Sequence, residues 1–404
     1  MGTFHPLGGF RVVDFTHVAS GPMTTKILAD FGAEVIKIES SKRPDLIRGV
    51  GPFRDNRPTV NSGGMYNIWN TGKLSFTLNL SHPKGIEIVK KLVLLSDLVI
   101  DNFSARVMKK WGLTYNDLIQ VKPDIIAVNL PSHGNTGPHK DYVSFGAELL
   151  ALAGITYLTG FPDSTPTGPD VNYPDFVICY LAAFSILAAL YHKKRTGKGQ
   201  HIEISQFEAT ASLLGPTLMD FAINSRNSMR RGNGSPVASP HGIYRCRGDE
   251  RWCAIAVTNE VQWKELCSTI GNPELLEDPR FKTLLNRLNN QKTLDRIIEQ
   301  WTREHSAEKI MEILQEKGIP AGVVQNGKDL LNDRHLKARR HYVELPHPEV
   351  GKMLYQNPTI LLCRTPKESR RSPLLGEHNN FILKELLGLT EKEKEELEKQ
   401  GVFD

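Results

Sequence analysis

The strongest candidate for a reacting group in this sequence is an acid that stands directly before a long uncharged segment. Asp175 lies in "NYPDFVICY", residues 172–180, and no charged residue follows it until after Tyr191. An aspartate carboxylate can attack a carbonyl and carry an acyl group, provided that hydrogen-bond donors stabilise the oxyanion. Because Pro174 makes the preceding residues extended, Asp175 also suits a helix N-cap, which contributes about 1 kcal/mol. The residues themselves leave both interpretations open.

The uncharged segment after Asp175 predicts a buried helix rather than a membrane span. Its sixteen residues, 176–191, extend about 24 Å as a helix at roughly 1.5 Å per residue, which is shorter than the hydrocarbon core of a bilayer. A buried helix must be covered by other elements of the fold, and these elements also determine where Asp175 lies.

Three histidines in loops are further candidates. His17 in "FTHVASGP" follows a short apolar segment of strand length, at a position where open α/β sheets bind ligands. His133 and His241 lie in loops rich in glycine or proline without a neighbouring acid or cysteine, so a polar surface position is the simpler interpretation. Glu39 ends the second such segment, where a dinucleotide-binding fold carries its ribose-binding acid, but the turn after the first segment lacks the three glycines of GxGxxG. A nicotinamide cofactor is therefore not predicted.

Basic residues stand at predicted turns and strand ends. Lys73 follows "NTG", and Arg106 and Lys110 follow "DNF". Lysine and arginine at such positions suit phosphate groups, although a solvated surface explains each of them as well. No cluster of His, Cys, Asp and Glu has metal-ligand spacing, so no metal site is predicted.

The bulk properties are typical of a globular protein with two domains. The chain has 404 residues, of which 40% are hydrophobic and 24% charged, and a formal net charge of +5. Acids and bases alternate along the sequence, which argues against nucleic acid as a partner. Five cysteines without a CxxC pair indicate a reducing compartment, and the first residues lack the order of a signal peptide. We therefore expect a cytoplasmic protein with no membrane partner.

Apolar segments of strand length alternate with amphipathic helical segments in the first half of the chain. The predicted strands are "FRVVDF", "EVIKIE", "KLSFTLNL", "LVIDNF" and "IIAVNLPS". Strands separated by helices predict an α/β fold with a doubly wound, Rossmann-like parallel sheet. The composition changes near residue 224, where "NSRNSMRRGNGSPVASPHG" marks a linker to a smaller domain. A second break is expected at 330–340, followed by a hairpin in "HPEVGKMLYQNPTILL".

These motifs, taken in their order, resemble the family III acyl-CoA:carboxylate CoA-transferases, which include the formyl-CoA, carnitine-CoA and benzylsuccinate-CoA transferases. The matching stretches are "LGGFRVVDFTHVASGPMTTKILADFGAEVIKIE", "NTGKLSFTLNL", "SDLVIDNF", "GNTGP", "TGKGQHIEISQFEA" and "LLGEHN", from about residue 7 to 380. The resemblance implies a large CoA-binding domain formed by residues 1–223 and completed by 336–404, with linkers and a smaller α+β domain in 224–335. It also implies an interlocked dimer of two ring-like subunits, either a homodimer or a heteromer with a related subunit.

The resemblance also assigns the site. Asp175 takes the place of the family's catalytic aspartate. The CoA thioester is a substrate, and no permanently bound cofactor is expected. The expected CoA contacts are His17, Val18, Ala19, Ser20, Asn70, Lys73, Asn102, Phe103, Arg106 and Lys110.

The chain departs from the family pattern in three places. Ser40 stands where formyl-CoA transferase has an adenine-stacking arginine. The substitute is expected among the nearby basic residues Lys42, Arg43 and Arg48. Residues 235–239, "SPVAS", replace a flexible glycine run of that enzyme. Ala147, with Glu148 beside it, occupies the position of an acid that helps to orient the substrates.

The implied reaction moves CoA from an acyl-CoA donor such as succinyl-CoA to a carboxylate acceptor, through an aspartyl mixed anhydride and an aspartyl-CoA thioester. The context "YPDF" and the absence of the glycine run favour an aromatic or bulky acceptor such as benzylsuccinate. One alternative is an α-methylacyl-CoA racemase, which needs a histidine in a stretch like "GHDINY", whereas this chain has "HKDYVSFG" with His139 displaced. The other alternative is a non-catalytic subunit of a hetero-oligomeric CoA-transferase, which the presence of Asp175 disfavours.

Overall fold

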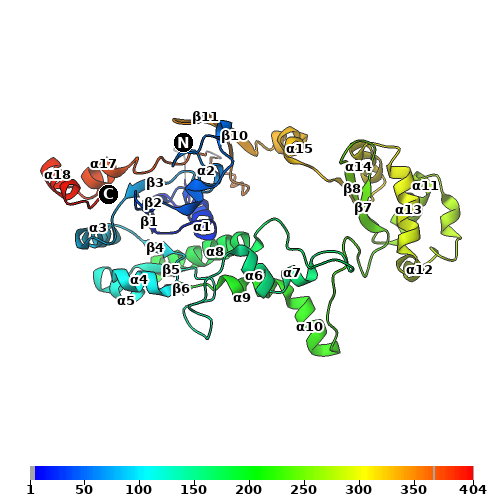
Figure 1. The fold of residues 1–404 in the computed structure, drawn as a ribbon, viewed down its shortest axis with the longest axis horizontal. Helices are drawn as coiled ribbons and strands as arrows, with labels where there is room; N and C mark the ends of the chain where they lie inside the picture. The colour runs from blue at the N-terminus through cyan, green and yellow to red at the C-terminus, as the bar shows by residue number, and fades with distance from the viewer. Residues whose placement is uncertain (1–4, 367–368, 404) are drawn as a thin grey trace. The chain divides into compact units, whose positions relative to one another are not determined.

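The computed structural model describes residues 5–366 and 369–403, and the chain divides into two compact units (Figure 1). The first unit contains residues up to Ile155, Pro169–Arg226 and residues from Lys337 onward. The second contains Thr156–Gly168 and Asn227–Leu336. These limits differ from the expected ones mainly at Thr156–Gly168, which the sequence places in the large domain. This segment groups with the second unit because its backbone bonds to residues 230–232, as in the 2.9 Å hydrogen bond from the Gly232 N–H to the Gly160 carbonyl.

The first unit is built on a parallel sheet of six strands in the order β3-β2-β1-β4-β5-β6. The strands are β1 (Arg11–Asp14), β2 (Glu34–Glu39), β3 (Leu74–Thr77), β4 (Leu98–Asp101), β5 (Ile126–Asn129) and β6 (His201–Glu203). All five neighbouring pairs are parallel. This is the strand order of a doubly wound dinucleotide-binding sheet, so the predicted α/β fold with a Rossmann-like sheet is confirmed.

Both faces of this sheet are buried, because successive strand residues point to opposite sides. Val13 and Ile36 belong to one core, together with residues of α3 (Pro83–Leu94) and α5 (Tyr115–Val121). Val12 belongs to the other core, together with residues of α1 (Ser20–Asp30) and α8 (Tyr173–Thr196). Helices α1 and α8 pack directly against each other on that face (Figure 1). Their contact matters below, because both begin at the candidate site.

Helix α8 is longer than the segment predicted from the sequence. It has 24 residues, because it continues through the basic cluster Lys193–Arg195 and ends at Gly197, whose φ is 71°. At about 1.5 Å per residue this is long enough to cross a bilayer, so the argument from a sixteen-residue segment is wrong. By length and composition α8 is one candidate span among the described residues, with 44% of its most apolar window buried inside the protein. Its buried side, with Ile178 and Ile186, belongs to the core that it shares with α1.

The end of the chain returns to the edge of the sheet. The hairpin of β10 (Tyr342–His347) and β11 (Gly351–Gln356) is close to the predicted one, although its first strand begins earlier. Beyond it, the Ser75 N–H donates to His378 Nδ1 at 3.1 Å, and the Thr77 N–H donates to Asn379 Oδ1 at 3.0 Å. The segment therefore covers the open edge of β3, where unpaired strand groups would otherwise face solvent.

The remaining helices of the first unit are short. They are α2 (Gly64–Trp69), α4 (Ala105–Trp111), α6 (Gly146–Leu152), α9 (Gln206–Ala211), α10 (Gly215–Asn224), α17 (Asn379–Phe381) and α18 (Glu391–Lys399). Helix α7 (Ile155–Leu158) stands at the junction with the second unit, and α16 (Arg334–Ala338) stands at the return to the first.

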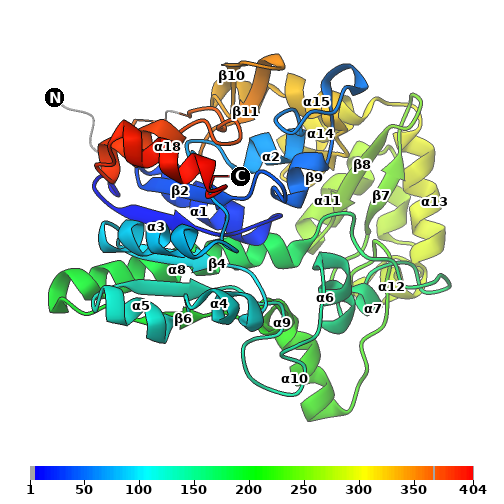
Figure 2. The same ribbon diagram turned by 60° about the vertical axis from the view of Figure 1, so that its left-hand side comes forward.

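The second unit contains both helices and an antiparallel sheet (Figure 2). Its antiparallel sheet has the order β7-β8-β9, formed by His241–Arg245, Trp252–Ala256 and Ala321–Val323. Its core includes Trp263, Phe281 and Ile298, which are all nearly inaccessible to solvent. The helices are α11 (Glu260–Thr269), α12 (Leu284–Asn289), α13 (Gln291–Thr302), α14 (Ala307–Glu316) and α15 (Gly327–Asn332).

Candidate active site

Asp175 lies in the first turn of α8 and is not its N-cap. Asn172 occupies the N-cap position and Pro174 lies in the first turn, where a missing N–H costs nothing. The cap interpretation of Asp175 is therefore wrong in its detail. The backbone N–H of Ser20, the first residue of α1, instead lies near enough to the carboxylate to lower its pKa. Two helix N-termini therefore meet at one acid, and the free N–H groups and dipole of each favour a negative charge there.

Burial is the main cause of the unusual ionisation of this acid. Desolvation raises the pKa of Asp175 to about 6, and the nearby Ser20 N–H only partly offsets that effect. The carboxylate is thus mostly ionised at neutral pH and more basic than an exposed aspartate. Such a group is well suited to act as a nucleophile.

The turn between β1 and α1 meets the residues that follow β4. Asn102 accepts a hydrogen bond from the His17 N–H at 2.8 Å and donates another to the His17 carbonyl at 2.8 Å. The ring of Phe103 packs edge-on against the His17 imidazole, with centroids 5.1 Å apart. Strands β1 and β4 are neighbours at the point where the strand order reverses, which is where open α/β sheets bind ligands. The structure thus brings these three expected residues together.

The rest of the turn is close to the backbone of α1. Val18 is partly buried and has a φ of 67°, whereas Ala19 and Ser20 are buried. Gly21 follows at a place where a side chain has no room, because a Cβ atom there would lie 2.3 Å from Thr16 Cβ. Main-chain groups therefore dominate what this turn can offer to a ligand.

Asn70 and Lys73 lie in the interior, beneath the start of α1. The Lys73 ammonium donates to Asn70 Oδ1 at 2.8 Å, to the Pro22 carbonyl at 3.0 Å and to Asp14 Oδ2 at 3.2 Å. Burial lowers the pKa of Lys73 to about 8, against the attraction of Asp14. The two side chains support α1 from below, and a direct contact with CoA stays a prediction.

Arg106 and Lys110 lie on α4 and are exposed. The Arg106 Nε atom is 3.9 Å from Asp141 Oδ1, and its side chain is 68% exposed. An ion pair this exposed contributes at most about 1 kcal/mol, so the guanidinium is available to an anionic ligand.

The three basic residues expected to replace an adenine-stacking arginine differ in their exposure to solvent. Arg48 is wrong as a candidate, because it is 1% exposed and forms two 2.7 Å hydrogen bonds with the Glu39 carboxylate. Glu39, which stands where a dinucleotide-binding fold has its ribose-binding acid, is equally buried. Its carboxylate holds Arg48 instead. Lys42 and Arg43 are exposed, and their backbone N–H groups donate to Ser40 Oγ.

Helix α6 begins next to the N-cap of α8. A Cβ atom on Gly146 would lie 2.6 Å from Asn172 Cγ, so the two helix starts are in close contact. Glu148 is exposed, and its carboxylate accepts the Phe145 N–H at 3.0 Å as part of a capping arrangement. Ala147 is exposed beside it. Among the described residues, no group of three or more His, Cys, Asp and Glu side chains could hold a metal ion.

Buried charges behind the turn are not apparent from the sequence. Lys37 and Asp45 form an ion pair of 3.0 Å in which both side chains are fully buried. The only signal in the sequence is a lysine inside the apolar strand "EVIKIE", where a parallel sheet buries both faces. A lysine there needs a buried acid, and the sequence does not show which one.

The chain belongs to CoA-transferase family III, whose description matches residues 7–379. The predicted family and the prediction of an enzyme are confirmed. A succinyl-CoA–D-citramalate CoA-transferase of Chloroflexus aurantiacus is 33% identical over 98% of both chains. The beta subunit of a succinyl-CoA–L-malate CoA-transferase from the same organism is 30% identical over 98% of both chains. A crystal structure of a CAIB/BAIF family protein from Brucella suis has a TM-score of 0.86 and 30% identity, and covers 94% of this chain and 99% of that one.

We expect Gly21→Ala to disrupt the turn, because the new Cβ atom would overlap Thr16. Overpacking of this kind typically destabilises a protein by about 1–3 kcal/mol. The displaced turn should also reduce kcat/KM by about tenfold or more. Gly49→Ala is the matched control, since no atom lies within 4 Å of a Cβ placed there. Equal unfolding free energies and equal rates for the two variants would contradict this account of the turn.

The raised pKa of Asp175 predicts the pH dependence of activity. The reactive form is the carboxylate, so kcat/KM should fall as the pH drops through about 6 and should level off above it. A profile measured between pH 4.5 and 8 tests this directly. An inflection near pH 4, the usual value for an exposed aspartate, would show that Asp175 is not desolvated as described.

Proposed function

We propose that this protein transfers CoA from an acyl-CoA donor to a carboxylate acceptor, with Asp175 as the nucleophile. The observation that supports this most is the environment of Asp175, a partly buried carboxylate with a raised pKa that faces the Ser20 N–H at the start of α1. A carboxylate with few water contacts attacks a carbonyl more readily, and a nearby backbone N–H can stabilise the oxyanion that forms.

The proposed reaction proceeds by two exchanges at the same carboxylate. One oxygen of Asp175 attacks the thioester carbonyl of the donor, and cleavage of the C–S bond leaves a mixed anhydride and CoA thiolate. The thiolate attacks the Asp175 carbonyl carbon, releases the donor carboxylate and forms an aspartyl-CoA thioester. The acceptor carboxylate then attacks this thioester, and the released thiolate attacks the acceptor's acyl carbon, which regenerates Asp175. No proton or electron is gained or lost overall.

The names of the relatives guide the choice of substrates. The two CoA-transferases reported above are named for succinyl-CoA and D-citramalate, and for succinyl-CoA and L-malate. We propose succinyl-CoA as the donor and a short hydroxydicarboxylate as the first acceptor to test. An aromatic or bulky acceptor such as benzylsuccinate is the alternative. Mass spectrometry of CoA esters formed from a panel of donors and acceptors identifies the pair.

We expect Asp175→Asn to abolish transfer, by about a thousandfold or more in kcat, because the amide oxygen is a poor nucleophile. The variant should still fold and bind CoA, since the amide has the shape of the carboxylate. Asp170→Asn is the matched control, because Asp170 is an exposed acid a few residues earlier. In the wild-type protein with donor present, hydroxylamine should convert the Asp175 side chain to a hydroxamate, detectable in the peptide mass. Full activity of Asp175→Asn would refute the proposal.

The same preparations separate the racemase from the transferase. A racemase exchanges the α-proton of a 2-methylacyl-CoA with solvent, so deuterium enters its product in deuterated water. The proposed transfer moves no C–H proton and gives no such label. Incorporation of deuterium without exchange of CoA would favour the racemase.

The exposed apolar side chains of the first unit support a partner subunit. The outer side of α8 carries exposed Tyr180, Phe184 and Tyr191, and α10 carries exposed Phe221 and Ile223. Apolar patches of this kind mark association surfaces in soluble proteins. We propose that a second copy of this chain covers them in an interlocked homodimer. A heteromer with a related subunit is the alternative, because one relative is named as a beta subunit. A cytoplasmic location stays part of this proposal.

An interlocked homodimer predicts a specific result in a subunit-exchange experiment. The purified chain should have about twice its mass of 45.3 kDa in light scattering and should be active alone. When tagged and untagged dimers are mixed, no mixed dimer should form until the protein is unfolded and refolded, because ring-like subunits cannot separate while folded. Rapid exchange under native conditions would show an ordinary dimer. An inactive monomer would favour a heteromer or a non-catalytic subunit.

A further inference from the structure

Val18, in the turn between β1 and α1, has an unusual backbone conformation. Its φ of 67° lies in the left-handed region, which β-branched residues strongly disfavour. Two residues later the chain reaches Ser20, whose N–H lowers the pKa of Asp175. The sign of φ at Val18 decides the direction in which the backbone leaves β1, so it also decides where the Ser20 N–H points. The surrounding structure must therefore hold this turn in place.

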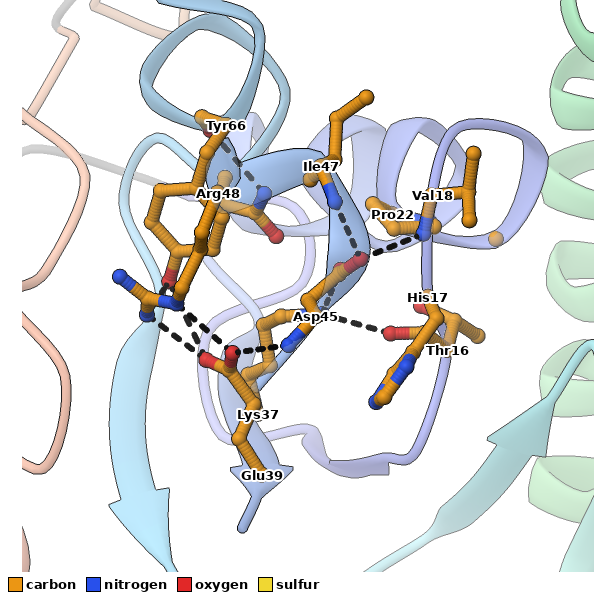
Figure 3. Close-up of polar contacts among 12 residues, drawn as sticks. Thr16, His17, Val18, Pro22, Lys37, Glu39, Asp45, Ile47, Arg48 and Tyr66 are labelled. Carbon is orange, nitrogen blue, oxygen red and sulfur yellow. Dashed lines mark hydrogen bonds and ion pairs between the residues drawn. The ribbon is translucent and has the colours of Figure 1, made fainter. Parts of the chain in front are cut away.

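Two buried side chains from outside the turn hold its backbone (Figure 3). Asp45 Oδ1 accepts the Val18 N–H at 2.9 Å, and the Lys37 ammonium donates to the Thr16 carbonyl at 2.6 Å. The other Asp45 oxygen pairs with Lys37 at 3.0 Å. One ion pair thus holds the peptide groups on both sides of His17.

Asp45 is itself fixed by its neighbours. Its Oδ1 atom also accepts the Ile47 N–H at 3.2 Å, and its own N–H donates to Glu39 Oε1 at 3.1 Å. Glu39 in turn is paired with Arg48, whose guanidinium lies 3.5 Å from the centre of the Tyr66 ring (Figure 3). The acceptor for the Val18 N–H therefore has little freedom to move.

The Asp45 carboxylate is charged under all conditions in which the enzyme would work. Burial opposes its ionisation, but the charge of Lys37, the proximity of His17 and the Val18 N–H together lower the pKa of Asp45 to about 2. His17, in the turn itself, is partly buried, and burial lowers its pKa. The other charged groups of this network are buried and paired. Lys73 pairs with Asp14, and Arg48 pairs with Glu39.

We propose that Asp45 is a positioning residue for the reaction: through the Val18 N–H it holds the turn after β1 so that the Ser20 N–H faces Asp175. This inference rests on the proposed role of Asp175. It goes beyond that role because Asp45 is buried behind the turn and bonds to the Val18 N–H rather than to Asp175. The residue acts through the backbone of a turn that would otherwise relax to negative φ and carry the start of α1 away from the acid.

The test is the ionisation of Asp175 in the resting protein, followed by carbon-13 NMR of labelled aspartate carboxyls. The signal is assigned by its absence in Asp175→Asn. In Asp45→Ala the Ser20 N–H should no longer stabilise the carboxylate, so the Asp175 midpoint should rise by about one pH unit. The pH at which kcat/KM falls on the acidic side of its profile should rise by the same amount, and kcat should fall by about tenfold or more.

Two further variants separate positioning from general damage. Val18→Pro leaves the Lys37–Asp45 pair intact, but it removes the donated N–H and forces φ to about −65°. It should raise the Asp175 midpoint as Asp45→Ala does, and it decides the matter alone if Asp45→Ala does not fold. Adding Val18→Gly to Asp45→Ala should return the midpoint part of the way, because glycine adopts positive φ without strain.

Asp30→Asn is the matched control, since it breaks another largely buried ion pair, with Lys26, at the far end of α1. It should leave the Asp175 midpoint unchanged. A wild-type midpoint in folded Val18→Pro and Asp45→Ala proteins would overturn the inference. The titration needs no substrate, so this outcome is distinct from a failure of the proposed function, which would appear as full activity in Asp175→Asn.

Discussion

The approach of the Ser20 N–H to the Asp175 carboxylate brings together the first turns of two helices that come from distant parts of the chain. It requires α1 and α8 to lie side by side on the same face of the sheet, with both N-termini at the end where ligands bind in such folds. Small side chains such as Ala182 and Ala189 on the buried side of α8 make this close packing possible. The chemistry of one carboxylate thus depends on how two helices pack.

The same region shows why charged residues occur inside a sheet that is buried on both faces. An unpaired charge in such a place is strongly destabilising, and a paired charge contributes little net stability. The pair Lys37–Asp45 is therefore better understood by what it holds than by the stability that it adds. It supplies fixed hydrogen-bond partners to a turn whose own side chains make few bonds. Apolar residues could fill this space but could not bind the free peptide groups of the turn.

The sequence was sufficient for those features that depend on local patterns. Apolar segments such as "FRVVDF" and "EVIKIE" predicted the strands, and ordered motifs led to Asp175 and to the turn at His17. Features that depend on pairing across the chain were missed. The sequence offers Arg48 as a substitute for the adenine-stacking arginine because it does not show the pairing with Glu39, and it does not show that Lys73 pairs with Asp14. The length of α8 was missed because its last turn is charged, while its true stop signal is Gly197.

The covering of β3 by residues near His378 and Asn379 has a consequence for biosynthesis. The strand at the edge of the large sheet is made well before the segment that shields it, because Ser75 and His378 are 303 residues apart in the chain. The second unit, whose core uses only residues from 244 to 323, can fold in the meantime as a separate body. The nascent protein therefore carries an open sheet edge until that segment is made, and an open edge is a site to which a chaperone or a neighbouring chain can attach.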